Sequence, residues 1–116
     1  MRQKNRKHLI VIAAIFVING SAFYAYGQDA KKLYDQTCST CHGPNGKGDG
    51  PTGKVLQPKP ADLSTALKGK EDTYISKAIH EGGASVGKSP LMPSYKGLLT
   101  DEQIRGLVQY VKGLSQ

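Results

Sequence analysis

The sequence predicts a small all-α domain of three to four helices. The clearest element is the stretch from Thr100 to Leu114, where apolar residues recur at helical spacing. No stretch shows the period-two alternation of apolar and polar residues that marks a half-buried strand. A chain of 116 residues without internal repeats accounts for one domain.

The first 27 residues are predicted to be a secretory signal peptide rather than part of this domain. Four basic residues precede an apolar run from Leu9 to Ile18, and Ala25-Tyr26-Gly27 offers small residues at the positions that signal peptidase recognises. Cleavage after Gly27 leaves residues 28–116 as the domain. The alternative is an uncleaved anchor, although the apolar run is short for a membrane span of about 20 residues. In both cases the domain is exported.

The first helix of the domain is expected to run from Ala30 into the cysteine pair, with Leu33 and Tyr34 on its apolar face. The C-terminal helix is the expected packing partner of that face. Between them, residues 43–60 are rich in glycine and proline and cannot sustain a helix or a central strand. A loop of this length in a small domain usually serves a site. Val55 and Leu56 are expected to face inward from it.

Two more helices are expected before the C-terminal one. A short helix is predicted over 61–67, and a longer one over 73–81, capped by Asp72 and ended by a glycine pair. In the C-terminal helix, Thr100 and Gln103 have the spacing of a capping box. These signals are local, so they predict elements rather than contacts.

Residues 38–42, Cys-Ser-Thr-Cys-His, carry the strongest functional signal. Two cysteines separated by two residues and followed by histidine have the spacing of a c-type haem attachment site. Both thiols can bond to one porphyrin, and His42 then lies under the iron as an axial ligand. Cys38 and Cys41 are the only cysteines of the chain.

Three other roles for this pair are weaker. A disulfide between the two cysteines would close a loop too short to constrain much of the unfolded chain. A redox-active dithiol of the thioredoxin type needs a βαβ context, which the sequence lacks. A zinc site needs about four ligands, and only the distant His8 or His80 could complete one. Covalent haem is therefore the favoured interpretation.

The second axial ligand has few candidates. Met92 is the only methionine besides the initiator, and it lies in a proline-flanked loop rather than on an amphipathic face. Methionine is usually a packing residue, but next to a haem motif its thioether is a known axial ligand. His80 is the alternative, although a ligand on a regular helix would draw that helix over the iron. Ligation by His42 and Met92 would raise the reduction potential relative to two histidines and leave no open axial position.

Together these segments resemble a bacterial monohaem class I cytochrome c over residues 29–116. The resemblance rests on CSTCHG (38–43), GKGDGP (46–51), QPKPADL (57–63), SPLMPSY (89–95) and LTDEQIRGLVQYVKGL (99–114). It implies the small cytochrome c fold, in which the N- and C-terminal helices cross and the chain wraps round one covalent haem c bound by Cys38 and Cys41.

The resemblance also implies two structural roles. The carbonyl of Pro51 would accept a hydrogen bond from Nδ1 of His42 and fix the orientation of the imidazole. The crossing helices would meet at Ala30, Tyr34 and Tyr110, with alanine where the family often has glycine.

We therefore expect an exported one-electron carrier, periplasmic or on the outer face of the cytoplasmic membrane, and not an enzyme. Its partners would be redox proteins that bind transiently to a monomer, with membrane association only if the leader is retained. The net charge of +7 does not indicate a nucleic-acid partner, because four positive charges lie in the leader and the other lysines are scattered among acids.

The main alternative keeps the haem but changes the class of protein. It is a tethered haem subunit, or the module through which electrons enter, of a membrane oxidoreductase complex. A haem-free metal-binding or structural module is a third possibility. A haem enzyme such as a peroxidase is disfavoured, because Met92 is expected to fill the sixth position and no distal acid–base pair is evident.

Overall fold

The computed structural model describes residues 29–116. The predicted signal peptide lies outside these residues. In chain order the helical elements are a helix over 29–37, α2 (Ser39–His42), the 3₁₀ turn η1 (Gly53–Val55), α3 (Leu63–Ala66), α4 (Asp72–Glu81), the 3₁₀ turn η2 (Gly83–Val86) and α5 (Asp101–Gly113). The described chain has no strand, only an isolated bridge between Lys96 and Leu99. The prediction of an all-α domain is confirmed.

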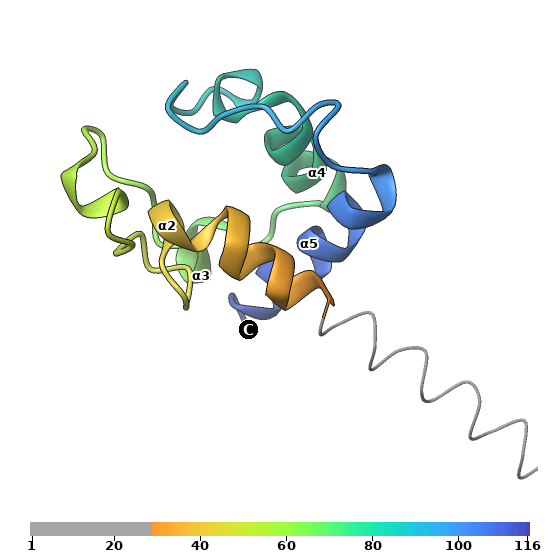
Figure 1. Cartoon of the computed structure of the whole chain (residues 1–116), viewed down its shortest axis with the longest axis horizontal. Helices are drawn as coiled ribbons and strands as arrows, with labels where there is room; N and C mark the ends of the chain where they lie inside the picture. The colour runs from red at the N-terminus through yellow and green to blue at the C-terminus, as the bar shows by residue number, and fades with distance from the viewer. Residues whose placement is uncertain (1–28) are drawn as a thin grey trace, which may run out of the picture.

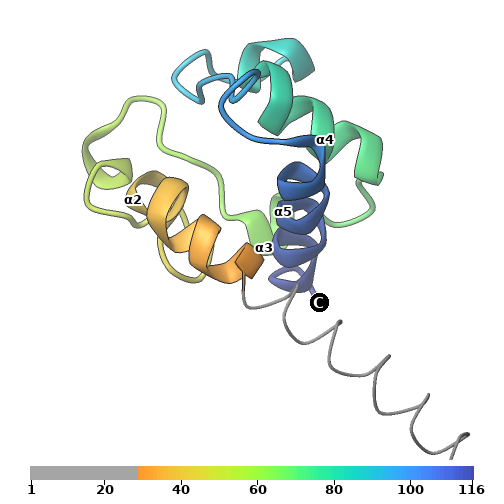
Figure 2. The same ribbon diagram turned by 45° about the vertical axis from the view of Figure 1, so that its right-hand side comes forward.

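The core lies where the helix over 29–37, called the N-terminal helix below, meets α4 and α5 (Figures 1 and 2). Tyr34 is fully buried, and its ring packs against that of Tyr110 with 5.0 Å between centroids. The N-terminal helix therefore packs on α5, as the sequence predicts. The buried apolar side chains are Ala30, Tyr34, Ile75, Ile79, Ile104, Leu107, Val108 and Val111.

The capping box of α5 is confirmed. The hydroxyl of Thr100 accepts from the backbone N–H of Gln103 at 3.1 Å, and the Gln103 side chain accepts from the N–H of Thr100 at 2.9 Å. Such a cap stabilises a helix by about 1 kcal/mol. α4 departs from its prediction by one residue, since Glu71 rather than Asp72 precedes the helix. Asp72 instead reaches across to Gln109 and Lys112 of α5.

The prediction that Val55 faces inward is wrong, because its side chain is 77 % exposed. The inward position of η1 belongs to Gly53, which is buried. A Cβ atom at Gly53 would lie 2.0 Å from the carbonyl oxygen of Cys41. The backbone of this loop, rather than an apolar side chain, therefore packs against the cysteine segment. Leu56 is half-buried.

None of the helices between residues 29 and 116 has the length and apolar character that a membrane crossing requires.

Candidate cofactor site

Cys38, Cys41 and His42 lie on one face of a short helical segment. The N-terminal helix ends at residue 37, Cys38 forms a turn, and α2 begins at the next residue. The N–H of His42 donates to the carbonyl of Cys38 at 2.9 Å, so helical geometry continues through the motif. Residues three and four positions apart are neighbours on a helix surface. The two thiols and the imidazole can therefore reach the same bound group.

The two thiols are free and half-buried. Burial, reinforced by the neighbouring Cys41, raises the pKa of Cys38 to about 11. A redox-active Cys-x-x-Cys pair instead depends on a thiolate with a lowered pKa. The environment of Cys38 is thus unlike that of a dithiol exchange site.

The imidazole of His42 has a buried nitrogen without a hydrogen-bond partner. This nitrogen is Nδ1, and no other side-chain nitrogen or oxygen between residues 29 and 116 is both buried and unpaired. Burial also lowers the pKa of His42, which favours the neutral imidazole that ligates metals. A buried polar atom without a partner calls for an explanation. A neutral imidazole beside two free thiols fits a covalently attached haem.

Backbone hydrogen bonds join the loop that follows the motif to α2. Two glycines permit this close approach, because a Cβ atom at Gly50 would lie 2.3 Å from the carbonyl oxygen of Thr40, and Gly53 is equally crowded. Both positions need glycine for lack of space. The hydrogen bonds run from Gly48 N to His42 O (2.7 Å), from Gly50 N to Cys41 O (3.3 Å) and from Thr52 N to Thr40 O (3.0 Å).

Pro51 lies between two of these anchored residues, Gly50 and Thr52, and is exposed. The structure does not pair its carbonyl with Nδ1 of His42, which has no partner among the described residues. The role of Pro51 as acceptor for that nitrogen stays a prediction.

Met92 is half-buried and packs against the core. Its carbonyl accepts from the N–H of Gly83 at 3.0 Å. Gly82 ends α4 with φ +89°, and a Cβ atom there would lie 3.1 Å from the same carbonyl oxygen. The glycine pair that ends α4 therefore allows the Met92 loop to return close to the helix. Ligation of iron by Met92 stays a prediction.

Tyr95 connects the Met92 loop to the cysteine segment, a contact that sequence reasoning missed. Its hydroxyl donates to the carbonyl of Thr37 at 3.2 Å. Burial raises the pKa of Tyr95, and the nearby thiols of Cys38 and Cys41 raise it further. The only signal in the sequence is an aromatic residue three positions after the candidate methionine.

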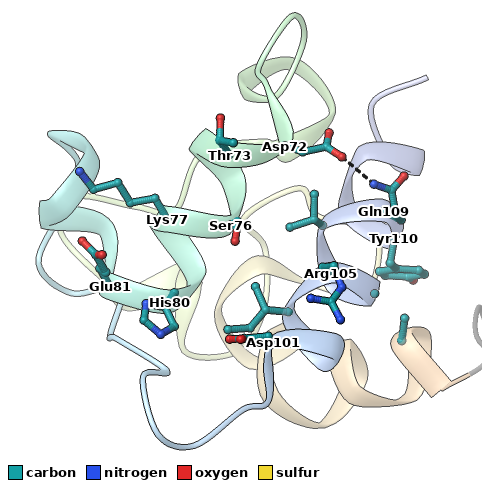
Figure 3. A pocket seen from close by; sticks show the side chains of 14 residues that line it. Asp72, Thr73, Ser76, Lys77, His80, Glu81, Asp101, Arg105, Gln109 and Tyr110 are labelled. Atoms are coloured by element: carbon teal, nitrogen blue, oxygen red, sulfur yellow. Dashed lines mark hydrogen bonds between the residues drawn. The ribbon is translucent and has the colours of Figure 1, made fainter.

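His80 lies on α4, and its backbone carbonyl accepts from the hydroxyl of Ser94, two residues after Met92, at 2.7 Å. It lines a groove of about 1330 Å³ between α4, α5 and the start of the N-terminal helix, which Asp101 of α5 also lines (Figure 3). Neither the cysteines, His42 nor Met92 lines this groove. The choice of Met92 over His80 as the second ligand stays a prediction. His8, the other candidate for a zinc site, lies outside the described residues.

An all-α domain with a Cys-x-x-Cys-His turn on its first helix is the architecture of a haem-bearing electron carrier. The family model for cytochrome c matches residues 27–115, and the chain belongs to this family. The sequence-based resemblance is therefore confirmed, and with it haem c as the cofactor.

Two curated relatives are similar to the chain. It is 30 % identical over 90 residues to the cbb3-type cytochrome c oxidase subunit CcoP of Azospirillum brasilense, an alignment that covers 78 % of this chain and 29 % of that protein. It is 29 % identical over 111 residues to cytochrome c-555 of Chlorobaculum tepidum, covering 91 % of this chain and 93 % of that protein. The chain thus spans less than a third of the first relative and nearly all of the second.

Proposed function

We propose that this chain is an exported one-electron carrier that holds one haem c through Cys38 and Cys41 and ligates the iron with His42 and Met92. The observation that carries the proposal is the shared helical face of two free thiols and the imidazole of His42, whose pKa is lowered by burial. This face offers two attachment points and one ligand within five residues.

In this proposal the cysteines attach the haem, and the other two residues of the site ligate its iron. Cys38 and Cys41 fix the porphyrin to the end of the N-terminal helix, which packs on α5 through Tyr34. His42 and Met92 come from segments far apart in the sequence and would take the two axial positions. When bound, the haem iron supplies one-electron chemistry by alternating between its ferrous and ferric states.

Occupation of both axial positions argues for electron transfer rather than catalysis. Activation of oxygen or peroxide needs an open position on the iron. A protein that fills both positions, and packs both ligand segments against one core, undergoes little rearrangement when it gains or loses an electron. The partners are then redox proteins that dock transiently at the exposed haem edge.

Similarity to cytochrome c-555 along nearly all of its length supports a small carrier that acts alone. Similarity to part of an oxidase subunit supports the second candidate, a tethered haem module of a membrane complex. The free carrier and the tethered module differ in whether residues 1–27 are cleaved from the mature protein. The intact mass of the mature protein, with its distribution between soluble and membrane fractions, separates them. A soluble protein beginning near Gln28 supports the free carrier, and a membrane-bound protein with its leader supports the tethered module.

Covalent attachment is tested by acid–acetone extraction of the protein expressed with its leader in a host that attaches haem c. We expect the haem to stay with the wild-type protein and with Thr40→Ala, a control at an exposed position inside the motif. A variant with Cys38→Ser and Cys41→Ser should release or lack haem. Wild-type protein that loses its haem on extraction would refute the proposal.

A further inference from the structure

The last turn of α4 takes two of its hydrogen-bond partners from the Met92 loop. The final carbonyls of an α-helix have no partner inside the helix. The carbonyl of Ile79 accepts from the backbone N–H of Tyr95 at 3.1 Å. The carbonyl of His80 accepts from the hydroxyl of Ser94 at 2.7 Å. One backbone and one side-chain hydrogen bond therefore hold the segment directly after Met92 to the end of α4.

Ser94 is close enough along the chain to restrict the backbone of Met92. Only Pro93 separates the two, and its ring fixes its own φ and favours extended backbone at the residue before it. On the other side, the carbonyl of Met92 accepts from the N–H of Gly83 at 3.0 Å. Pro93 has no N–H and adds no anchor of its own. Within the described chain, the Ser94 hydroxyl is thus the one side-chain group of residues 92–95 that hydrogen-bonds to α4.

We propose that Ser94 is a positioning residue, whose hydroxyl holds the Met92 segment against the end of α4 and so keeps Met92 on the iron. The inference rests on the proposed ligation of iron by Met92. When an added ligand displaces Met92, the segment must make room at the iron, and the bond to His80 opposes that movement. Removal of the hydroxyl should therefore ease ligand exchange. Removal of a hydroxyl elsewhere at this helix end should only lower stability.

The test compares Ser94→Ala with Ser85→Ala in the haem-loaded protein. Ser85 lies in η2, and its hydroxyl also bonds at the end of α4, to the carbonyl of Gly82 at 2.7 Å. Each substitution removes one hydroxyl from the same helix end, but only Ser94 belongs to the Met92 segment. Ser94 is exposed, so alanine there leaves no cavity. Ser94→Thr, which keeps a hydroxyl, tests rescue.

The main readout is the affinity of the oxidised protein for added imidazole, measured by spectrophotometric titration. Thermal unfolding is measured on the same samples. We expect Ser94→Ala to bind imidazole about fivefold more tightly than wild type, the change in an equilibrium constant that one neutral hydrogen bond corresponds to. Ser85→Ala should unfold at a similarly lowered temperature but bind imidazole as wild type does. Ser94→Thr should restore the wild-type affinity.

A Ser94→Ala protein with wild-type affinity for imidazole would overturn the proposal even if it unfolds at a lower temperature, because the hydroxyl would then be merely structural. Equal gains in affinity for Ser94→Ala and Ser85→Ala would overturn it as well, since the effect would then come from the end of α4 as a whole. So would a Ser94→Thr protein that behaves like Ser94→Ala, or a Ser94→Ala protein that fails to accumulate, because the hydroxyl would then be needed for folding.

The proposed function and this inference fail in different ways. Wild-type protein that loses its haem on extraction refutes covalent attachment, and a wild-type spectrum without a methionine–iron charge-transfer band refutes ligation by Met92. The role of Ser94 falls with either result. Wild-type protein with covalent haem and this band, combined with a Ser94→Ala protein of wild-type affinity, refutes only the role of Ser94.

Discussion

The hydroxyl of Tyr95 donates a hydrogen bond to the backbone carbonyl of Thr37, 3.2 Å away, across 58 residues of sequence. Thr37 precedes Cys38, and Tyr95 follows Met92 by three positions. The backbone N–H of Tyr95 also donates to the carbonyl of Ile79 on α4 at 3.1 Å. A single residue thus joins the segment that carries the candidate second ligand to the start of the haem-attachment motif and to the core.

Removing this hydroxyl should loosen the Met92 loop. A neutral hydrogen bond contributes about 1 kcal/mol net, which corresponds to roughly a fivefold change in an equilibrium constant. We therefore expect Tyr95→Phe to raise the affinity of the oxidised protein for added imidazole by about fivefold, because imidazole must displace Met92. Spectrophotometric titration measures this affinity. Tyr74→Phe, a half-buried tyrosine on α4, is the control and should behave as wild type. Equal affinities for Tyr95→Phe and wild type would contradict the account.

The loop over 43–60 lies so close to α2 that alanine should be tolerated less well at Gly53 than at Gly113. A Cβ atom at Gly53 would lie 2.0 Å from the carbonyl oxygen of Cys41, whereas one at Gly113 meets nothing within 4 Å. Overpacking of this kind costs about 1–3 kcal/mol. Gly53→Ala should lower the unfolding free energy by that amount and reduce the fraction of protein that carries haem, while Gly113→Ala should do neither. Denaturant unfolding and the ratio of haem to protein absorbance measure both effects. A Gly53→Ala protein as stable and as fully loaded as Gly113→Ala would show that the loop does not pack as described.

The contact between α4 and α5 predicts a pH dependence. A hydrogen bond from Lys112 is the largest cause that lowers the pKa of Asp72, with a further hydrogen bond from Gln109. A carboxyl with a lowered pKa in the folded state stabilises the fold above its unfolded pKa, and this contribution is lost as pH falls through the folded value. Asp72→Asn should therefore be less stable than wild type at neutral pH and equally stable in strong acid.

Because Asp72 is exposed, the difference should be small and should shrink at high salt. Thermal unfolding from neutral pH into the acid range, at low and high salt, measures it. Lys112→Gln, which removes the partner, should reproduce the neutral-pH loss. A deficit that persists unchanged below the pKa of Asp72 would argue against this contact.

The parts of the fold that follow from the sequence are those with local causes. The α5 cap depends on Thr100 and Gln103, three residues apart. The shared face of Cys38, Cys41 and His42 follows from helical spacing in the same way. Short-range geometry was enough for both, and the structure agrees with it.

The contacts that sequence reasoning missed depend on how distant segments meet. Neither the hydrogen bond of the Tyr34 hydroxyl to the carbonyl of Gly43 nor that of Tyr95 to Thr37 has a periodic signature, since a buried aromatic residue looks like ordinary core. The error at Val55 has a related cause. Apolar character indicated an inward side chain, but the loop approaches α2 so closely that only the bare backbone of Gly53 fits.

The most direct test of the account is the visible spectrum of the oxidised wild-type protein beside Met92→Ala, with Leu91→Ala as the control at a neighbouring exposed position. The account predicts a methionine–iron charge-transfer band in the wild type and in Leu91→Ala. In Met92→Ala the band should be lost, the reduction potential should fall, and the iron should bind added ligands. A covalent haem whose wild-type spectrum lacks the band, or a Met92→Ala protein with unchanged spectrum and potential, would contradict it.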